Sequence, residues 1–219
     1  MAGSAASTSA RATTASQRER RRRILDAAIS LARQGGYDAV QMREVADLAG
    51  VALGTLYRYF PSKVHLLAAA MVGQLEALHD HLLREPPEGN DAGERVIAVI
   101  YRLIGALERD KLMGDALVRA MVVAGPEEVE QINSVNSSII ATAIHGRGAS
   151  ATQCDYAISL LIGKVLMTDL LGWLCGRMSI ERVRASLSDM VAVSMAGQHV
   201  LEESAVGARP SMTVHPAPD

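Results

Sequence analysis

Residues 40–63 have the sequence VQMREVADLAGVALGTLYRYFPSK, and this stretch decides the fold of the first part of the chain. Apolar residues at helical spacing predict two short helices within it, at about residues 42–48 and 53–59. Gly50 between them supplies the backbone freedom that a tight turn after a helix requires. The small side chain of Ala46 lets the two helices cross closely. The stretch therefore predicts a helix-turn-helix.

The second of these helices presents a face suited to the major groove of DNA. Leu56 and Phe60 occupy its inward positions, which disfavours ordinary packing as the alternative role of its two tyrosines. Near the helix start, the backbone at Gly54 can approach base edges, and Thr55 can contact a base directly. Tyrosine hydroxyls and a lysine ammonium group further along are typical phosphate ligands. The predicted DNA contacts of this stretch are Arg43, Leu53, Gly54, Thr55, Tyr57, Arg58, Tyr59 and, at the start of the next helix, Lys63.

A basic cluster, RERRRR at residues 18–23, lies at the start of a helix predicted at residues 17–34. Cations at a helix N-terminus oppose the helix dipole, so the cluster does not serve helix stability. Arg20 and Arg22 are expected to track phosphates or to reach the minor groove, and the alternative is a solvated run of charge. Residues 1–65 carry ten Lys and Arg against five Asp and Glu, whereas the remainder has a net charge of −7. This asymmetry would orient the molecule on DNA.

The segment GTLYRYFPSK, preceded by REVADLAGV and by a basic amphipathic helix that ends in a Gly-rich turn, resembles the DNA-binding domain of TetR-family transcriptional regulators over residues 18–67. Within that family, AVQMREVAD and GTLYRYFPSKVHLL are most similar to the KstR-like group of steroid-catabolism regulators. The chain departs from the family pattern at Gln41 and Ala52, where members usually carry Ser, Thr or a similar polar residue. The resemblance implies an all-α fold, with a three-helix helix-turn-helix domain followed by a helical domain that binds ligand and dimerises.

The rest of the chain is predicted to form a series of amphipathic helices. Their expected bounds are residues 63–84, 91–108, 111–123, 127–145, 153–177 and 179–196. The first would be shared by both parts of the molecule and act as a lever, because its first turn carries Lys63. The fifth is apolar on more than one face, so we expect one side to pack in the core and another against a partner subunit.

The predicted organisation has four parts. They are a disordered arm at residues 1–16, a helix-turn-helix DNA-binding domain at 17–65, a ligand-binding and dimerisation domain at 66–197 and a flexible tail at 198–219. A single recognition helix reads only a few base pairs, so specific binding favours a two-fold dimer on matching half-sites. We expect a homodimer formed through the last two helices, bound to a double-stranded palindromic operator.

The sequence offers no candidate for catalysis or metal binding. It contains no GxSxG, HExxH, P-loop or GxGxxG pattern, and its two cysteines, Cys154 and Cys175, are isolated. His79 and His81 lie two residues apart on a predicted helix, so they point in different directions and cannot hold one metal ion. We therefore expect no cofactor, no metal and no enzymatic activity, which disfavours a helical enzyme.

The same sequence features bear on localisation. No secretory signal pattern is present, and charges such as Lys164 and Asp169 interrupt the apolar runs before about 18 residues accumulate. The two cysteines lie too far apart on one predicted helix for a disulfide bond. A reduced cytoplasmic protein without a membrane segment is expected.

The helical body is expected to hold an apolar ligand pocket. After residue 66 its aromatic residues are Tyr101, Tyr156 and Trp173, too few for an aromatic cage around a cation, whereas its methionines supply adaptable lining. The alternative for the methionines is core filling, and Lys164 either extends to solvent or meets an anionic ligand group. The predicted ligand-binding residues are Tyr101, Met113, Leu117, Met121, Asn133, Lys164, Val165, Thr168 and Trp173.

Together these features predict a ligand-responsive transcriptional repressor that is released from its operator by a bulky apolar small molecule. The KstR-like resemblance implies a steroid-derived or acyl-CoA metabolite as this effector. The alternative is a regulator of the same architecture that is controlled by a protein partner or has no effector.

Overall fold

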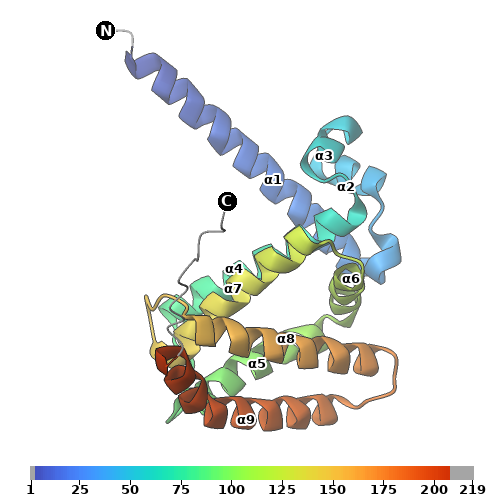
Figure 1. The fold of residues 1–219 in the computed structure, drawn as a ribbon. Helices are drawn as coiled ribbons and strands as arrows, with labels where there is room; N and C mark the ends of the chain where they lie inside the picture. Colours follow the sequence, from blue (N-terminus) through green and yellow to red (C-terminus); the bar gives the residue numbers. More distant parts are fainter. Residues whose placement is uncertain (1–2, 208–219) are drawn as a thin grey trace, which may run out of the picture.

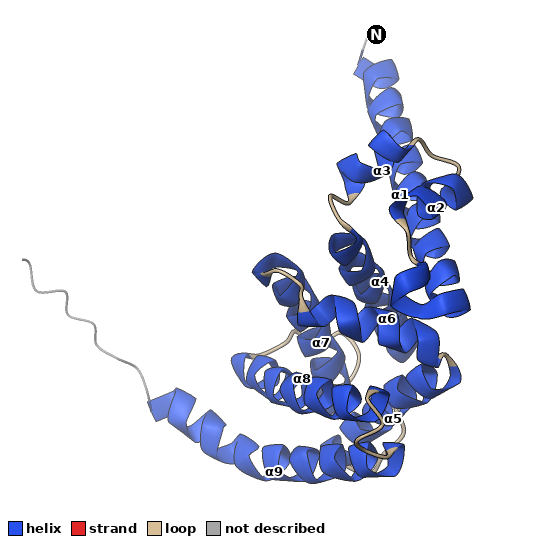
Figure 2. Cartoon of the chain, turned by 90° about the vertical axis from the view of Figure 1, so that its right-hand side faces the viewer, coloured by secondary structure: helices blue, strands red, loops and turns tan. Residues whose placement is uncertain are grey.

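The computed structural model describes residues 3–207, with side chains described from Ala15 to Gly197, and these residues form helices and no strand. The helices are α1 (Gly3–Ala39), α2 (Met42–Ala49), α3 (Leu53–Tyr59), α4 (Lys63–Arg84), α5 (Ala92–Arg109), α6 (Lys111–Val122), α7 (Pro126–His145), α8 (Gln153–Leu174) and α9 (Ile180–Gly207). Helices α1 to α3 lie at one end of the molecule, and α8 and α9 lie at the other (Figures 1 and 2). The predicted all-α class is confirmed.

Helix α1 differs from its prediction at its start. It begins at Gly3 rather than at Gln17, so residues 3–16 are helical where disorder is predicted, and residues 1 and 2 lie outside the described residues. The segment is rich in alanine, the strongest helix former, which explains the extension. At the other end, non-helical backbone angles at Gly35 and Gly36 interrupt α1, with a φ of 68° at Gly36. The predicted break at these two glycines is therefore confirmed.

The helix-turn-helix is built as the pattern predicts. Leu56 and Phe60 are buried, as are the inward residues of α2. Gly50 ends α2 in the left-handed conformation, with φ 65°, and its N–H donates to the carbonyl oxygens of Ala46 and Asp47. Gln41 and Ala52 precede α2 and α3 without a side-chain capping bond. The turn therefore depends on the glycine and the two apolar anchors rather than on caps.

Three apolar clusters hold the helices together, two large ones and a small third one formed by Leu107, Val118 and Leu170 of α5, α6 and α8. The first core joins α1, α2, α3 and the start of α4, and it is completed by four buried residues of α6: Met113, Ala116, Leu117 and Ala120. The second core joins α4, α5, α7, α8 and α9. The sequence predicts a shared role for α4, and the structure adds α6 as a second element that belongs to both parts. The small residues Ala116 and Ala120 account for this, because they let α6 approach α1 closely.

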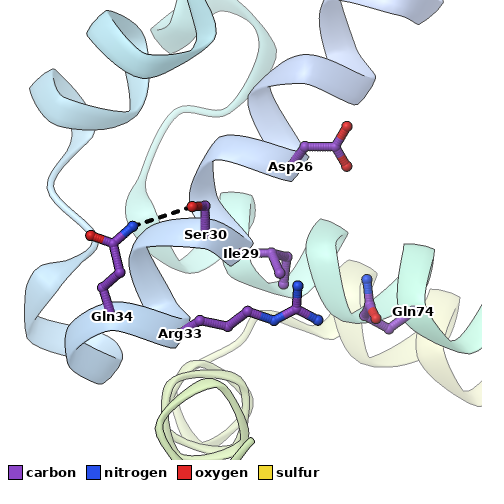
Figure 3. Close-up of a pocket in the computed structure, with 6 residues that line it drawn as sticks. All are labelled: Asp26, Ile29, Ser30, Arg33, Gln34 and Gln74. Carbon is purple, nitrogen blue, oxygen red and sulfur yellow. Dashed lines mark hydrogen bonds between the residues drawn. The ribbon is translucent and has the colours of Figure 1, made fainter.

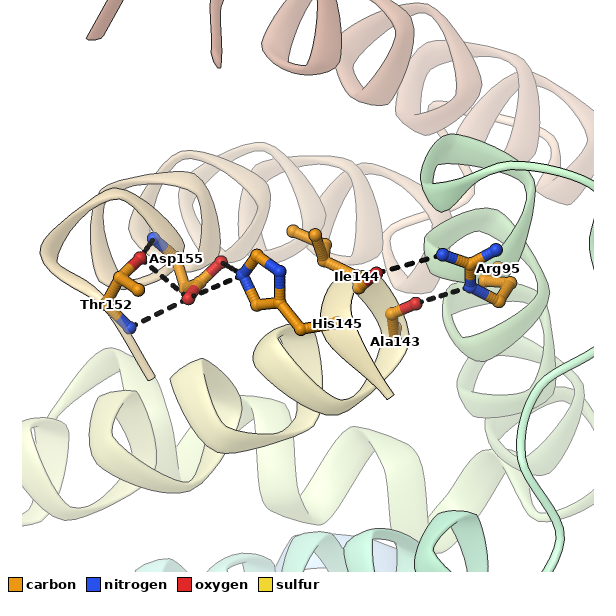
Figure 4. A network of polar contacts seen from close by, with 6 residues as sticks. All are labelled: Arg95, Ala143, Ile144, His145, Thr152 and Asp155. Atoms are coloured by element: carbon orange, nitrogen blue, oxygen red, sulfur yellow. Dashed lines mark hydrogen bonds and ion pairs between the residues drawn. The ribbon is translucent and has the colours of Figure 1, made fainter. Parts of the chain in front are cut away.

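Buried polar contacts fix the far end of α7 (Figure 4). The carboxylate of Asp155 is fully buried, accepts hydrogen bonds from the backbone and hydroxyl of Thr152, and lies 3.0 Å from Nε2 of His145. Arg95 of α5 donates to two carbonyl oxygens in the last turn of α7. These contacts satisfy groups that a helix end leaves free, and they hold α5, α7 and α8 together.

The last two helices also differ in their ends. Helix α8 stops at Leu174 rather than at Arg177, and a glycine with φ 69°, Gly176, follows it. Helix α9 continues past the predicted end at Ala196 to Gly207, because the intervening residues contain no proline. The predicted tail is thus helical as far as Gly207, and residues 208–219 lie outside the described residues.

By length and composition alone, α8 is the single helix in the described part of the chain that is apolar enough to cross a membrane. The sequence analysis predicts no such segment because Lys164 and Asp169 lie within it. The helix starts with a capping box at Thr152, and it packs against both α7 and α9. These are features of a helix inside a folded domain, and apolar residues that remain exposed on it indicate a further contact surface.

Candidate DNA-binding surface and ligand cavity

The predicted reading surface lies on one short helix at the end of the molecule. On α3, Gly54, Tyr57 and Arg58 are exposed, while Leu53 and Thr55 are partly buried. A Cβ atom added at Gly54 would meet nothing within 4 Å, so the backbone there is open to a partner. Arg43 of α2 is also exposed. Tyr59 is partly buried, with its ring 6.3 Å from that of Phe60 and packed against the first core.

Lys63 is held close to α1 at the beginning of α4. Its ammonium nitrogen lies 3.9 Å from the centre of the Tyr37 ring. Burial lowers the pKa of Lys63, and the negative charge of Asp38 opposes that shift. This cation–π contact therefore fixes the position of the Lys63 charge next to the helix-turn-helix.

The basic cluster of α1 divides into cations with different surroundings. Arg22 is paired with Glu19 at 2.8 Å, and this hydrogen bond lowers the pKa of Glu19. Arg21 lies 5.6 Å from the centre of the Phe60 ring, a contact that the sequence analysis does not predict. Arg20 is partly buried. Arg20 and Arg22 are the two arginines of this cluster that are predicted to contact DNA, and Arg22 already has an acidic partner. Exposed ion pairs of this kind contribute little to stability and exchange readily.

Two polar contacts connect the DNA-binding domain to the body. His65, in the first turn of α4, places Nε2 3.0 Å from Oε1 of Glu128 in the first turn of α7, and its Nδ1 lies 2.8 Å from the hydroxyl of Ser62. Arg33 of α1 donates to Asp110, between α5 and α6, at 2.6 Å. Each contact joins a helix of the DNA-binding domain to the start of a helix in the body.

An open polar groove lies between α1 and α4 (Figure 3). It has a volume of about 420 Å³ and is lined by Asp26, Ile29, Ser30, Arg33, Gln34 and Gln74. Gln74 is also a lining residue of the larger cavity described next, so the two spaces adjoin at this side chain. None of the predicted site residues lies in this groove.

The body contains an apolar cavity of about 570 Å³ walled by α4, α5, α6, α7 and α8. This volume is within the range of small-molecule sites in proteins. Most of its lining is aliphatic or methionine, and none of the described residues that line it is aromatic. Its polar lining residues are Gln74, Arg102, Arg109, Asn133, Asn136, Lys164 and Thr168.

Six of the nine predicted ligand-binding residues line this cavity. They are Met113, Leu117, Met121, Asn133, Lys164 and Thr168. Met113 and Leu117 belong at the same time to the first core, so a single helix, α6, forms a wall of the cavity and part of the DNA-binding domain.

The other three predicted residues lie elsewhere. Tyr101 is exposed on the opposite face of α5, where its hydroxyl is 2.7 Å from Ser188 of α9. Val165 packs against the second core. The Trp173 ring lies under the ammonium group of Lys111, at 5.1 Å. The side of each helix that faces the cavity is set by how α5 and α8 pack, which a single-sequence pattern does not reveal.

Arg102 and Arg109 are cavity residues that sequence reasoning missed. They lie seven residues apart on α5, two helical turns, and therefore on one face. Exposed arginines on an amphipathic helix are normally assigned to its solvent side. The signal that was available is that Ala106, between them, is small and lies on the same face.

Comparison with known families identifies both parts of the chain. The family described as bacterial regulatory proteins of the tetR family matches residues 24–70, and the tetracyclin repressor-like C-terminal domain matches residues 89–193. The chain is 40% identical to the HTH-type transcriptional repressor KstR of Mycobacterium tuberculosis over 83% of each chain. It is 41% identical to the repressor of the same name from Rhodococcus jostii, over 76% of this chain and 78% of that protein.

Solved structures agree on the fold. A TetR transcriptional regulator from Rhodococcus sp. RHA1 has a TM-score of 0.74 at 30% identity, covering 82% of this chain and 97% of that one. The FadR repressor of Thermus thermophilus, solved with lauroyl-CoA, has a TM-score of 0.62 at 19% identity over 91% and 98% of the two chains, and it shares the fold. Proteins of this family are DNA-binding regulators rather than enzymes, and they bind DNA as dimers. From its helix-turn-helix to the end of its helical body, this chain belongs to the TetR family of bacterial transcriptional regulators.

Proposed function

We propose that the protein is a repressor that binds a palindromic operator as a homodimer and leaves it when a bulky apolar small molecule occupies the cavity. The observation that carries this proposal is the position of α6, which lines the cavity with Met113 and Leu117 and contributes the same residues to the core of the DNA-binding domain. A molecule that enters the cavity must press on a helix against which α1 is packed.

The DNA contacts are assigned by chemistry. On α3, Thr55 and the open backbone at Gly54 suit base edges, while Tyr57, Arg58 and Lys63 suit phosphates on either side. Arg43 and Arg20 extend the phosphate surface onto α2 and α1. The names of the KstR relatives, which are repressors, support repression as the direction of control.

A steroid-derived or acyl-CoA metabolite is the effector that we favour. The described lining consists mainly of aliphatic and methionine side chains and includes no aromatic ring, which suits a bulky aliphatic or alicyclic ligand body. The similarity to the KstR-like group supports a steroid-derived one. The cavity also argues against the alternative of a regulator without an effector, because a space of this size inside a packed body forfeits contacts unless something fills it.

Dimerisation is assigned to α8 and α9. Leu161 of α8 and Val193 of α9 are exposed, with 47% and 73% of their surfaces accessible in the single chain, and α8 as a whole is the most apolar helix of the body. Packing these faces against a second copy would remove them from water and form a four-helix interface. Because its target is the bacterial chromosome, we place the protein in the cytoplasm and not in the membrane.

The contacts with phosphate and with bases differ in their expected response to substitution. Lys63→Ala should weaken binding to all DNA sequences and lower the slope of log affinity against log salt by ~0.9, because one phosphate contact is lost. Thr55→Ala should change the ranking of sequences instead. Both are measured by fluorescence anisotropy on a fragment of the promoter region of the protein's own gene. An unchanged salt slope in Lys63→Ala would contradict the phosphate assignment.

The dimer assignment is tested by placing a charge on the exposed face of α8. Leu161→Glu should convert the dimer to a monomer at micromolar concentration, since an unpaired carboxylate would be buried in the interface. Leu48→Glu, on a comparably exposed leucine of α2, is the matched control and should leave the dimer intact. The masses are measured by sedimentation velocity, and a dimeric Leu161→Glu protein would rule out this face.

The effect of filling the cavity is tested by introducing a large side chain into it by substitution. Gly163 lines the cavity, and a Cβ atom added there would meet nothing within 4 Å, so we expect the ring of Gly163→Phe to fill part of the space. We expect operator affinity to fall about tenfold, the typical size of an allosteric coupling. Gly73→Phe on α4, which is equally open but does not line the cavity, should bind DNA normally.

Sedimentation of the same samples separates this effect from a loss of dimer. A dimeric Gly163→Phe protein with wild-type operator affinity would refute control through the cavity, whatever the identity of the natural effector.

A further inference from the structure

We infer that the contact between His65 and Glu128 carries the state of the cavity to the DNA-binding surface. The contact is made when the protein can bind its operator, and it is broken when the cavity is filled. This inference rests on the proposed function, because it requires the cavity to control DNA binding. It goes further by assigning the transmission to two positioning residues, neither of which lines the cavity.

The contact joins a turn of α4 and a turn of α7 that serve different purposes. His65 lies two residues after Lys63, which we assign to DNA phosphate and which is held 3.9 Å from the centre of the Tyr37 ring. Glu128 lies one residue before Val129, a lining residue of the cavity. The distance between Nε2 of His65 and Oε1 of Glu128 is 3.0 Å. A single side-chain contact therefore connects the turn that carries the phosphate ligand to the turn that lines the cavity.

The carboxylate of Glu128 is held in place by α7. Only 15% of its side chain is exposed, and it lies in the first turn of the helix, where the helix dipole favours a negative charge. A Cβ atom added at Gly125 would lie 2.8 Å from Oε2 of Glu128, so the glycine leaves the room that this carboxylate occupies. Glu127, its neighbour in the same turn, is exposed. Glu128 therefore moves with α7, whereas a carboxylate on a free surface could follow His65.

The imidazole ring of His65 is held in turn by the start of α4. Its Nδ1 lies 2.8 Å from the hydroxyl oxygen of Ser62, and the same oxygen accepts a hydrogen bond from the backbone N–H of His65 at 3.3 Å. Ser62 is the N-cap residue of α4. Because the ring is tied to the cap, a displacement of Glu128 acts on the first turn of α4 rather than on a loose side chain.

Filling the cavity acts on this contact through α7. Val129, Ile132 and Asn133 line the cavity from the first turns of the helix, so a molecule that presses on them displaces the helix start that carries Glu128. Packed helices shift as units, and two groups that are each fixed to their own helix cannot follow one another. The arrangement with a filled cavity therefore lacks the contact, and the arrangement that makes it is the one that binds DNA.

The contact also completes the restraint on α6. Arg33 of α1 holds Asp110 at the start of α6, and Glu128 follows shortly after Val122, where α6 ends. The helix that belongs to both the cavity wall and the core of the DNA-binding domain is thus tied to that domain near each of its ends. Loss of the contact at α7 frees one end while Arg33 still holds the other, which lets α6 turn relative to α4.

The first test removes the contact alone, and operator affinity is measured by fluorescence anisotropy on the promoter fragment. We expect Glu128→Ala to lower the affinity about threefold, a size typical of a partly exposed ion pair. Removing a negative charge from a DNA-binding protein would by itself strengthen its attraction to phosphate, so a fall in affinity has the opposite sign to a general charge effect. Glu127→Ala is the matched control, because it removes the same charge from the same turn, and it should not lower the affinity.

The second test combines Glu128→Ala with Gly163→Phe, which distinguishes a coupling contact from an independent stabilising one. We expect Gly163→Phe to break the contact already, so Glu128→Ala should lower the affinity no further, and the double variant should bind about tenfold more weakly than the wild type, as Gly163→Phe does alone. Two independent effects would instead multiply to about thirtyfold. His65→Leu should give the same pattern, and combining it with Glu128→Ala should add no further loss.

Two outcomes would overturn the inference. One is wild-type operator affinity in Glu128→Ala and His65→Leu, and the other is multiplication of either effect with that of Gly163→Phe. Both leave the proposed function standing as long as Gly163→Phe alone lowers the affinity, whereas an inert Gly163→Phe variant would remove control through the cavity and this inference together. The Tm and the sedimentation velocity of every variant separate these outcomes from a loss of fold or of dimer.

Discussion

The packing of α6 against α1 is the contact on which the rest of the structure depends. Ala116 and Ala120 let the two helices approach closely, and Met113 and Leu117 are buried in the core of the DNA-binding domain while they also wall the cavity. Interiors are close-packed and shift between discrete arrangements rather than deforming smoothly. In the mechanism that we propose, a change in what the cavity contains would therefore become a change in where α1 lies, and the short helix α3, which we assign to DNA contact, would move with α1.

The polar contacts between the DNA-binding domain and the body constrain how the two can move relative to each other, and they supply little of the free energy that holds them together. The pair His65–Glu128 joins the start of α4 to the start of α7, and the pair Arg33–Asp110 joins α1 to the junction of α5 and α6. Both are partly exposed, and exposed pairs contribute at most about 1 kcal/mol each. Because every one of these contacts ends on a helix that lines the cavity or adjoins one that does, they restrict the ways in which the reader can move relative to the body.

Local chemistry explains which parts of the structure the sequence predicts. The helix-turn-helix follows from a left-handed glycine at Gly50 and buried anchors at Leu56 and Phe60, all within one short stretch. The break at Gly35 and Gly36 is equally local. The shared role of α6, the cavity positions of Arg102 and Arg109, and the outward position of Tyr101 depend on the relative placement of helices far apart in the chain. Amphipathic periodicity identifies an apolar face but not the helix against which that face packs.

The central claim is that the cavity and the DNA reader communicate through α6, and hydrogen exchange of its backbone amides tests this most directly. Thermodynamic coupling is reciprocal, so DNA bound at α3 must affect the cavity wall if the wall affects DNA binding. The account predicts slower exchange along Lys111–Val122 when the dimer binds its promoter fragment. Protection confined to α2, α3 and the first turn of α4, with unchanged exchange in α6, would contradict it.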